Sequence, residues 1–212
     1  SLTENDEIIY VRSHLFGGDW ICGLPAEEKI EPEEPYPEIE AKFPKFLPKA
    51  YENLMNNLLE QIHDINLPRF FLGDPTEVTF SQSWSGGLIS ILNYMEYPLL
   101  FEMNWVSADF WDEQLLICFR NGWIDLKLPP PLLRNVPARV HVYRAGKIRR
   151  DEFPHGAWAW SFERQAQHFV ECILGDKEPV SNGLDSYKDV VIVEDILKAM
   201  LNEKPKKIEF VL

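Results

Sequence analysis

Apolar and polar residues alternate through much of the middle of the chain, which is the period of strands that bury one face. The first such segment is Glu7–His14, which alternates in part and is ended by Gly17-Gly18. Asn121-Gly122 separates two later apolar runs and predicts a tight hairpin, because both residues tolerate a positive φ. Short links of this kind predict an antiparallel sheet. The later strands are expected at Glu77–Ser83, Leu88–Glu96, Leu99–Ser107, Glu113–Arg120, Trp123–Leu128 and Arg139–Arg144.

A helical period replaces the alternation over Ala50–Leu72. The apolar positions of this segment that share one face are Leu54, Leu58, Ile62 and Ile65. Gly73 is a typical stop residue at the C-terminal end of a helix. Pro68 has no backbone N–H and clashes with the preceding turn. We therefore predict a helix to about Ile65 and a short second turn after it.

Two more helices are expected near the end of the chain, at Trp158–Leu174 and Asp185–Asn202, with a short final strand at Lys207–Leu212. A sheet of this size needs its apolar face covered, and we expect the two late helices to cover it. The order of the elements predicts one α+β domain over residues 1–212. Its sheet is expected to be open and mostly antiparallel, with six or more strands and helices on one face.

The composition limits the class of protein. Of the 212 residues, 45% are apolar and 13% aromatic, enough for a sizeable core. The net charge of −13 repels nucleic acids and anionic bilayers, so neither is expected as a partner. No apolar run reaches the roughly 18–20 residues of a membrane span. Three scattered cysteines favour a reducing, cytoplasmic location. Residues 19–48 contain six prolines and many glutamates, which predicts an irregular acidic loop.

His63 is the first candidate for chemistry, because an imidazole exchanges protons near neutral pH. Glu60 precedes it by three positions, about one helical turn, so its carboxylate can orient the ring and stabilise the imidazolium. The alternative is a histidine at a helix end that hydrogen-bonds to the backbone. The spacing alone leaves both interpretations open.

A second group of candidates follows the first strand. Arg12 and His14 lie near its end and Trp20 in the loop after Gly17-Gly18, where binding residues concentrate. Arg12 can clamp an anionic group and Trp20 can stack on a sugar, but an exposed charge beside a turn is equally compatible. His155 precedes a tryptophan-rich helix start and is a candidate for a pocket rim. The histidines show no HExxH or similar spacing, so the sequence predicts no metal site.

Three segments together resemble a known family. Ile62–Pro75 is similar to the Ile-His-x-Ile-Asp-x-x-Arg-x-Leu-x-Gly-x-Pro stretch in the C-terminal domain of the glucose-fructose oxidoreductase/inositol dehydrogenase (Gfo/Idh/MocA) family. Phe162–Phe169 with the following Ile173-Leu174-Gly175 resembles the closing helices of that domain. Glu7–Arg12 resembles the first strand after the cofactor domain. The resemblance implies the C-terminal fold shared with dihydrodipicolinate reductase.

The resemblance also implies an activity. Members of the family move a hydride between NAD or NADP and a sugar or polyol, and His63 falls at their active-site histidine. The aspartate often found four residues before this histidine is Leu59 here, and the one three residues after it is Asn66, which we keep as a candidate for substrate binding. A Gly-x-Gly-x-x-Gly turn is absent. We therefore expect a dinucleotide-binding domain to precede these residues, and the chain alone to bind no cofactor and to be inactive.

Two functions of different class remain open. In the first, the chain is the substrate-binding and assembly domain of a nicotinamide-dependent sugar or polyol oxidoreductase, with His63 and Glu60 as its proton-transfer groups. In the second, it is a non-catalytic oligomerisation or binding module on the same scaffold. In both, helices on one side leave the other sheet face open, and apolar residues there predict a homo-oligomer formed through that face.

Overall fold

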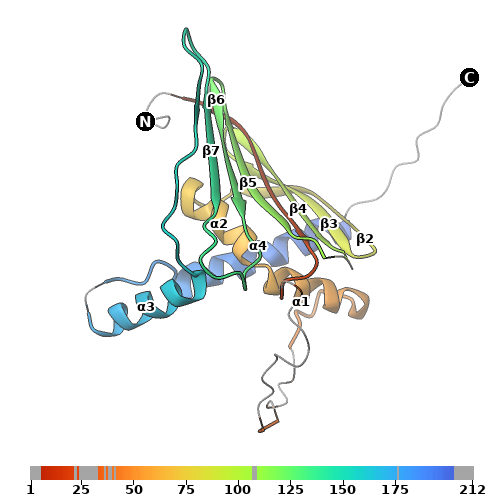
Figure 1. Ribbon diagram of the computed structural model, residues 1–212. Coiled ribbons are helices and arrows are strands. Elements are labelled where there is room, and N and C mark those ends of the chain that lie inside the picture. The colour runs from red at the N-terminus through yellow and green to blue at the C-terminus, as the bar shows by residue number, and fades with distance from the viewer. Residues whose placement is uncertain are drawn as a thin grey trace, which may run out of the picture.

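The structure is a computed structural model that describes residues 6–21, 23, 33–35, 37, 40, 42–106, 109–175 and 177–202. The strand expected at Lys207–Leu212 and part of the acidic loop, including residues 24–32, lie outside the described residues. The described part contains one eight-stranded sheet with the order β2-β3-β4-β1-β5-β6-β7-β8 (Figure 1). The strands are β1 Ile8–Gly17, β2 Glu77–Trp84, β3 Gly87–Tyr94, β4 Tyr97–Trp105, β5 Asp112–Phe119, β6 Gly122–Leu128, β7 Arg139–Arg144 and β8 Arg150–Glu152.

The first strand lies in the middle of the sheet, between β4 and β5. It is parallel to β4 and antiparallel to β5, whereas every other neighbouring pair is antiparallel. Short turns join the strands from β2 to β6, apart from the longer link before β5, and force neighbours to run in opposite directions. β1 precedes the helices along the chain, so no hairpin fixes its direction. The predicted mostly antiparallel sheet is confirmed, with one parallel pair and a short β8 that the sequence did not predict.

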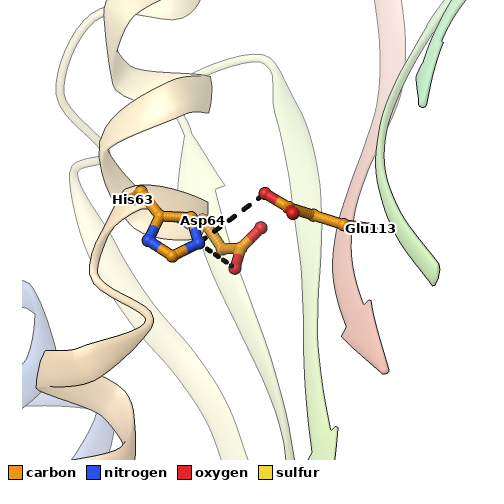
Figure 2. Close-up of side chains that lie close together, drawn as sticks. All are labelled: His63, Asp64 and Glu113. Carbon is orange, nitrogen blue, oxygen red and sulfur yellow. Dashed lines mark ion pairs between the residues drawn. The ribbon is translucent and has the colours of Figure 1, made fainter. Parts of the chain in front are cut away.

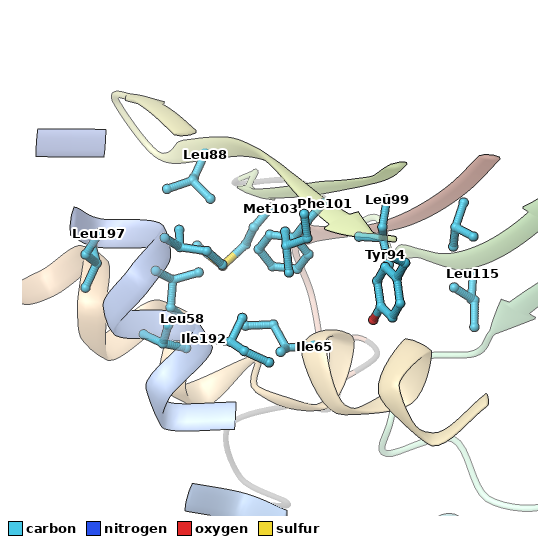
Figure 3. Packing of buried hydrophobic residues seen from close by; sticks show 14 of the residues in the cluster. Leu58, Ile65, Leu88, Tyr94, Leu99, Phe101, Met103, Leu115, Ile192 and Leu197 are labelled. Atoms are coloured by element: carbon cyan, nitrogen blue, oxygen red, sulfur yellow. The ribbon is translucent and has the colours of Figure 1, made fainter. Parts of the chain in front are cut away.

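Three helices form the layer that covers one face of the sheet (Figure 1). They are α1 Glu52–Glu60, preceded by the 3-10 turn Lys49–Tyr51, α2 His63–Leu72 and α4 Gly183–Asn202. Alternation places Val11, Leu99, Phe101, Met103 and Leu115 on the covered face, all 1% exposed or less. Each such buried side chain contributes about 1.5–3 kcal/mol to the free energy of unfolding. Figure 3 shows Leu58, Ile65, Ile192 and Leu197 of the three helices packed beneath the strands.

α3, which spans Ser161–Ile173, does not cover the sheet, so the predicted role of this helix is wrong. None of its residues is buried, and Phe169 and Ile173 are about two-thirds exposed. Figure 1 shows α3 to one side of the strands, with only its beginning near the sheet. The period of its apolar residues predicted a helix correctly, because a period reports amphipathicity and not the surface that the apolar face contacts.

The helix break also differs from the prediction. α1 ends at Glu60, α2 begins at His63, and Pro68 lies inside α2 instead of ending it. Because Pro68 has no N–H, the carbonyl of Asp64 lacks its helical donor. The hydroxyl of Ser13 on β1 donates a hydrogen bond to this carbonyl at 2.9 Å. The sheet therefore satisfies the group that the proline leaves free, and the helix continues.

We predict that Ser13→Ala lowers the free energy of unfolding by about 1–3 kcal/mol, because it leaves a buried carbonyl without a donor. Pro68→Ala restores a backbone N–H four residues after Asp64, so Ser13→Ala should cost clearly less in that background. Urea unfolding of the two single variants, the double variant and the parent chain measures both costs. Equal costs in the two backgrounds would refute the proposed link between α2 and β1.

Candidate functional site

The beginning of α2 brings two polar side chains against the covered face of the sheet. His63 is the first residue of α2 and Asp64 the second, and both lie next to Glu113 at the start of β5 (Figure 2). In β5 the residues on the covered face are Glu113, Leu115, Ile117 and Phe119. Glu113 is therefore a carboxyl group on the apolar face of a strand, a position that charged residues rarely occupy without a partner.

Three polar atoms converge at this point. His63 Nε2 lies 3.5 Å from Asp64 Oδ2 and 3.7 Å from Glu113 Oε1. The indole N–H of Trp111 donates to the other oxygen of Glu113 at 3.1 Å. Asp64 is 2% exposed and Glu113 6%, whereas the His63 side chain is 53% exposed. The site thus has a buried acidic floor with an accessible imidazole at its edge.

The two carboxyl groups are hard to ionise together. Burial raises the pKa of Glu113 to about 7, a rise that hydrogen bonds from Trp111 and with Asp64 oppose. Burial and the charge of Glu113 raise the pKa of Asp64 well above its ordinary value. Desolvation lowers the pKa of His63. The pair therefore tends to keep a proton where an ordinary carboxylate has lost it.

A cavity of about 610 Å³ opens beside these residues. It is lined by His63, Glu113 and Trp111 and by the beginning of α3. The segment between β6 and β7 supplies an apolar wall, which includes Pro129, Pro130, Pro131, Leu133, Val136 and Pro137. Arg164 and Gln165 add polar groups from α3. The cavity has the size and the mixed lining of a small-molecule site, and His63 and Glu113 lie next to each other in its wall.

Glu60 does not accompany His63 in the structure. It is an exposed residue at the end of α1, and the break after Gln61 removes it from the helix that carries His63. The carboxyl groups that lie within 4 Å of His63 are those of Asp64 and Glu113. The i−3 spacing assumed a continuous helix, which the chain does not form there.

Arg12 and His14 lie on the opposite face of the sheet from His63. Ser13, between them, faces α2, so alternation directs its two neighbours away from the helices. Arg12 pairs with Glu102 at 2.6 Å. His14 is 3% exposed and lies 3.1 Å from Asp112, and burial lowers its pKa. The structure therefore does not bring Arg12 or His14 into the cavity.

Trp20 and His155 also lie outside the residues that line the cavity. Trp20 is half exposed in the turn after β1. His155 forms an isolated bridge with Arg139, and its neighbours Gly156 and Ala157 do line the cavity. His155 is thus the nearer of the two to the site, beside its rim.

Asn66 belongs to a different cluster, which joins α2 to α4. Its amide donates to Asp185 and Asp189, at 2.9 Å each. Arg69 pairs with the same two aspartates and with Asp74. Arg69 is 6% exposed, so its charge needs these partners. The side chain of Asn66 is occupied by a structural network on the far side of α2 from Glu113.

No protein-family model and no curated protein matches the sequence. Solved structures do share the fold. The chain matches UDP-N-acetylglucosamine 3-dehydrogenase from Acidithiobacillus ferrooxidans at a TM-score of 0.59 and 12% identity, covering 91% of this chain and 54% of that one. It matches the dehydrogenase MviM from Clostridium difficile at a TM-score of 0.59 and 16% identity, covering 94% of this chain and 57% of that one. A 3-ketoreductase from Actinomadura kijaniata, complexed with TDP-benzene and NADP, matches at a TM-score of 0.59 and 12% identity. The match covers 92% of this chain and 52% of that one.

These comparisons confirm the expected fold. The chain spans just over half the length of the solved oxidoreductases that it matches. Among the described residues, no helix combines the length and the apolar character that a membrane crossing requires.

We predict that Asn66→Asp destabilises the chain by about 1–3 kcal/mol at neutral pH, because it replaces two donated hydrogen bonds by a carboxylate beside Asp185 and Asp189. Thermal and urea unfolding measure the effect. Asn56→Asp, on the exposed side of α1, is a matched control for the change of charge. A stability equal to that of the control would show that the amide of Asn66 contributes nothing to the junction between α2 and α4.

Proposed function

We propose that the chain is the substrate-binding and assembly part of a nicotinamide-dependent oxidoreductase that acts on a sugar, a polyol or a related hydroxyl compound. The observation that carries the proposal is the convergence of His63 and Glu113 on a cavity, in a fold shared with sugar-nucleotide dehydrogenases and ketoreductases. A hydride transfer to or from a carbinol carbon requires a group that exchanges the proton of its oxygen. His63 is the accessible titratable group of the cavity and takes this role in the proposal.

Glu113 takes the place that Glu60 had in the sequence-based hypothesis. Its carboxyl group faces the imidazole, and Trp111 fixes its orientation. Asp64 lies behind both, so it positions them and does not contact the substrate. Arg164 and Gln165, which also line the cavity, would bind further hydroxyl or anionic groups of the substrate.

The nicotinamide cofactor belongs, in this proposal, to a dinucleotide-binding domain that precedes these residues in the complete protein. The basis is the absence of a Gly-x-Gly-x-x-Gly turn in the chain. One of the structures that share the fold holds NADP. The choice between NAD and NADP rests with residues outside this chain.

We predict that His63→Gln lowers kcat about 10²–10⁴-fold in the full-length gene product, because the proton-transfer group is lost while the shape is kept. Turnover of NADH or NADPH with a panel of keto-sugars and polyols measures it, with circular dichroism to check the fold. His141→Gln, which alters an exposed His–Asp pair on the other face, is the control. Unchanged turnover in His63→Gln would reject the role of His63. Absence of turnover in the parent protein with every substrate would favour the non-catalytic module.

Assembly through the open sheet face is the second part of the proposal. Ile91, Leu100, Arg12 and Leu116 lie in one row across β3, β4, β1 and β5, on the face opposite the helices. The three aliphatic side chains of this row are only partly buried. A flat surface that mixes aliphatic groups with a paired Arg12 is suited to contact a second copy of the chain.

We predict a dimer or larger oligomer at tens of micromolar protein, which Leu116→Lys converts towards monomer by placing a charge in that face. Sedimentation velocity measures the change. Ile148→Lys is the matched control, since Ile148 is 73% exposed in the β7–β8 link. A monomeric parent chain, or dissociation by the control alone, would count against this interface.

A further inference from the structure

Three groups that can ligate a metal ion meet at the floor of the cavity. We propose that His63, Asp64 and Glu113 bind one divalent ion of the zinc class, with a coordination position left open to the cavity. One ligand atom from each residue lies within 4.8 Å of the other two. The proposal does not depend on the oxidoreductase function, because the ion can be measured on the chain itself.

The separations suit an ion at the centre. Bonds of about 2.0–2.2 Å in a tetrahedral arrangement hold two ligand atoms about 3.4 Å apart. His63 Nε2 lies 3.5 Å from Asp64 Oδ2 and 3.7 Å from Glu113 Oε1. These distances are too long for hydrogen bonds and close to those that an ion requires. Only small side-chain movements would complete the site.

The burial of the carboxyl groups favours the binding of a cation. Asp64 Oδ2 is buried and has no hydrogen-bond partner among the described residues. The ion pairs of the described residues give neither Asp64 nor Glu113 a lysine or arginine. A buried carboxylate without a cation is costly, whereas a divalent ion neutralises both groups.

The surroundings of Glu113 are those of a prepared ligand. Trp111 donates to Glu113 Oε2 and leaves Oε1 facing His63. Residues that hold a ligand in this way strengthen metal sites in general. Asp64 is held from the other direction, since its backbone carbonyl accepts the hydroxyl of Ser13. Trp111 thus fixes the carboxyl group of Glu113 and Ser13 fixes the backbone of Asp64, and neither contact occupies an oxygen that the ion needs.

The donor set indicates the class of ion and of ligand. One imidazole nitrogen with two carboxylate oxygens suits Zn²⁺ and its first-row neighbours, whereas Mg²⁺ prefers oxygen ligands and retained water. Three protein ligands and an open position are typical of catalytic zinc sites. His63 and Glu113 line the cavity, so the open position would take water or a hydroxyl, carbonyl or carboxylate oxygen. With the ion bound, His63 Nε2 is a ligand, so the proton-transfer role proposed above for His63 applies to the metal-free chain.

Titration calorimetry with Zn²⁺ on the metal-free chain tests the proposal. We expect one ion per chain, and at least tenfold weaker binding in Glu113→Gln and in His63→Gln. His63 is half exposed, so His63→Gln should fold even if the substitution of the buried Glu113 prevents folding. Circular dichroism checks the fold of both variants. Binding of Co²⁺ should give the intense visible absorption of a tetrahedral site, lost in the same variants.

The control is His168→Gln, because His168 Nε2 lies 3.6 Å from Cys172 Sγ and offers zinc a different position. We expect this variant to bind zinc like the parent chain, and Mg²⁺ to bind weakly to all of them. The proposal is overturned by any of three results: no zinc binding to the parent, equal binding to the parent and to folded His63→Gln, or loss of binding in His168→Gln.

Discussion

A hydrogen bond from the hydroxyl of Ser13 to the backbone carbonyl of Asp64 joins α2 to the centre of the sheet. Pro68 leaves this carbonyl without a donor inside the helix, and β1 provides one. The contact fixes the first turn of α2 against the centre of the sheet. His63 and Asp64 are therefore held beside β5, where Glu113 emerges from the covered face.

The acidic floor is the feature of the molecule that packing does not explain. An apolar side chain at position 113 would continue the buried row of Leu115 and Ile117, and would avoid the cost of burying a second carboxyl group beside Asp64. Buried groups with strongly perturbed pKa values are found preferentially at functional sites. Here the two carboxyl groups lie next to an accessible histidine and a cavity. The three side chains can hold a proton, as the proposed oxidoreductase function requires, or a divalent ion, as the proposed metal site requires.

Much of the fold follows from local patterns in the sequence. Alternation located the long strands because each buries one face, and the Asn121-Gly122 turn fixed one hairpin. The site is harder to predict from the sequence, because it depends on the pairing of strands that are far apart along the chain. His63 was found by its chemical type, but Glu113 becomes its neighbour only because β5 pairs with β1 beneath α2. Its signal was available in the sequence, as a carboxyl group in register with Leu115 and Ile117. The alternation of β1 directs Ser13 towards α2, and it therefore directs Arg12 and His14 to the opposite face of the sheet, away from His63.

Asp64 and Glu113 have carboxylate oxygens within 4.8 Å of each other, and a double-mutant cycle with Asp64→Asn and Glu113→Gln measures their interaction through the free energy of unfolding. Groups in contact couple by about 0.5–3 kcal/mol, whereas distant groups give additive effects. The structure predicts a coupling free energy of at least about 1 kcal/mol at neutral pH. Additive effects of the two substitutions would contradict it, and with it the site described at the beginning of α2.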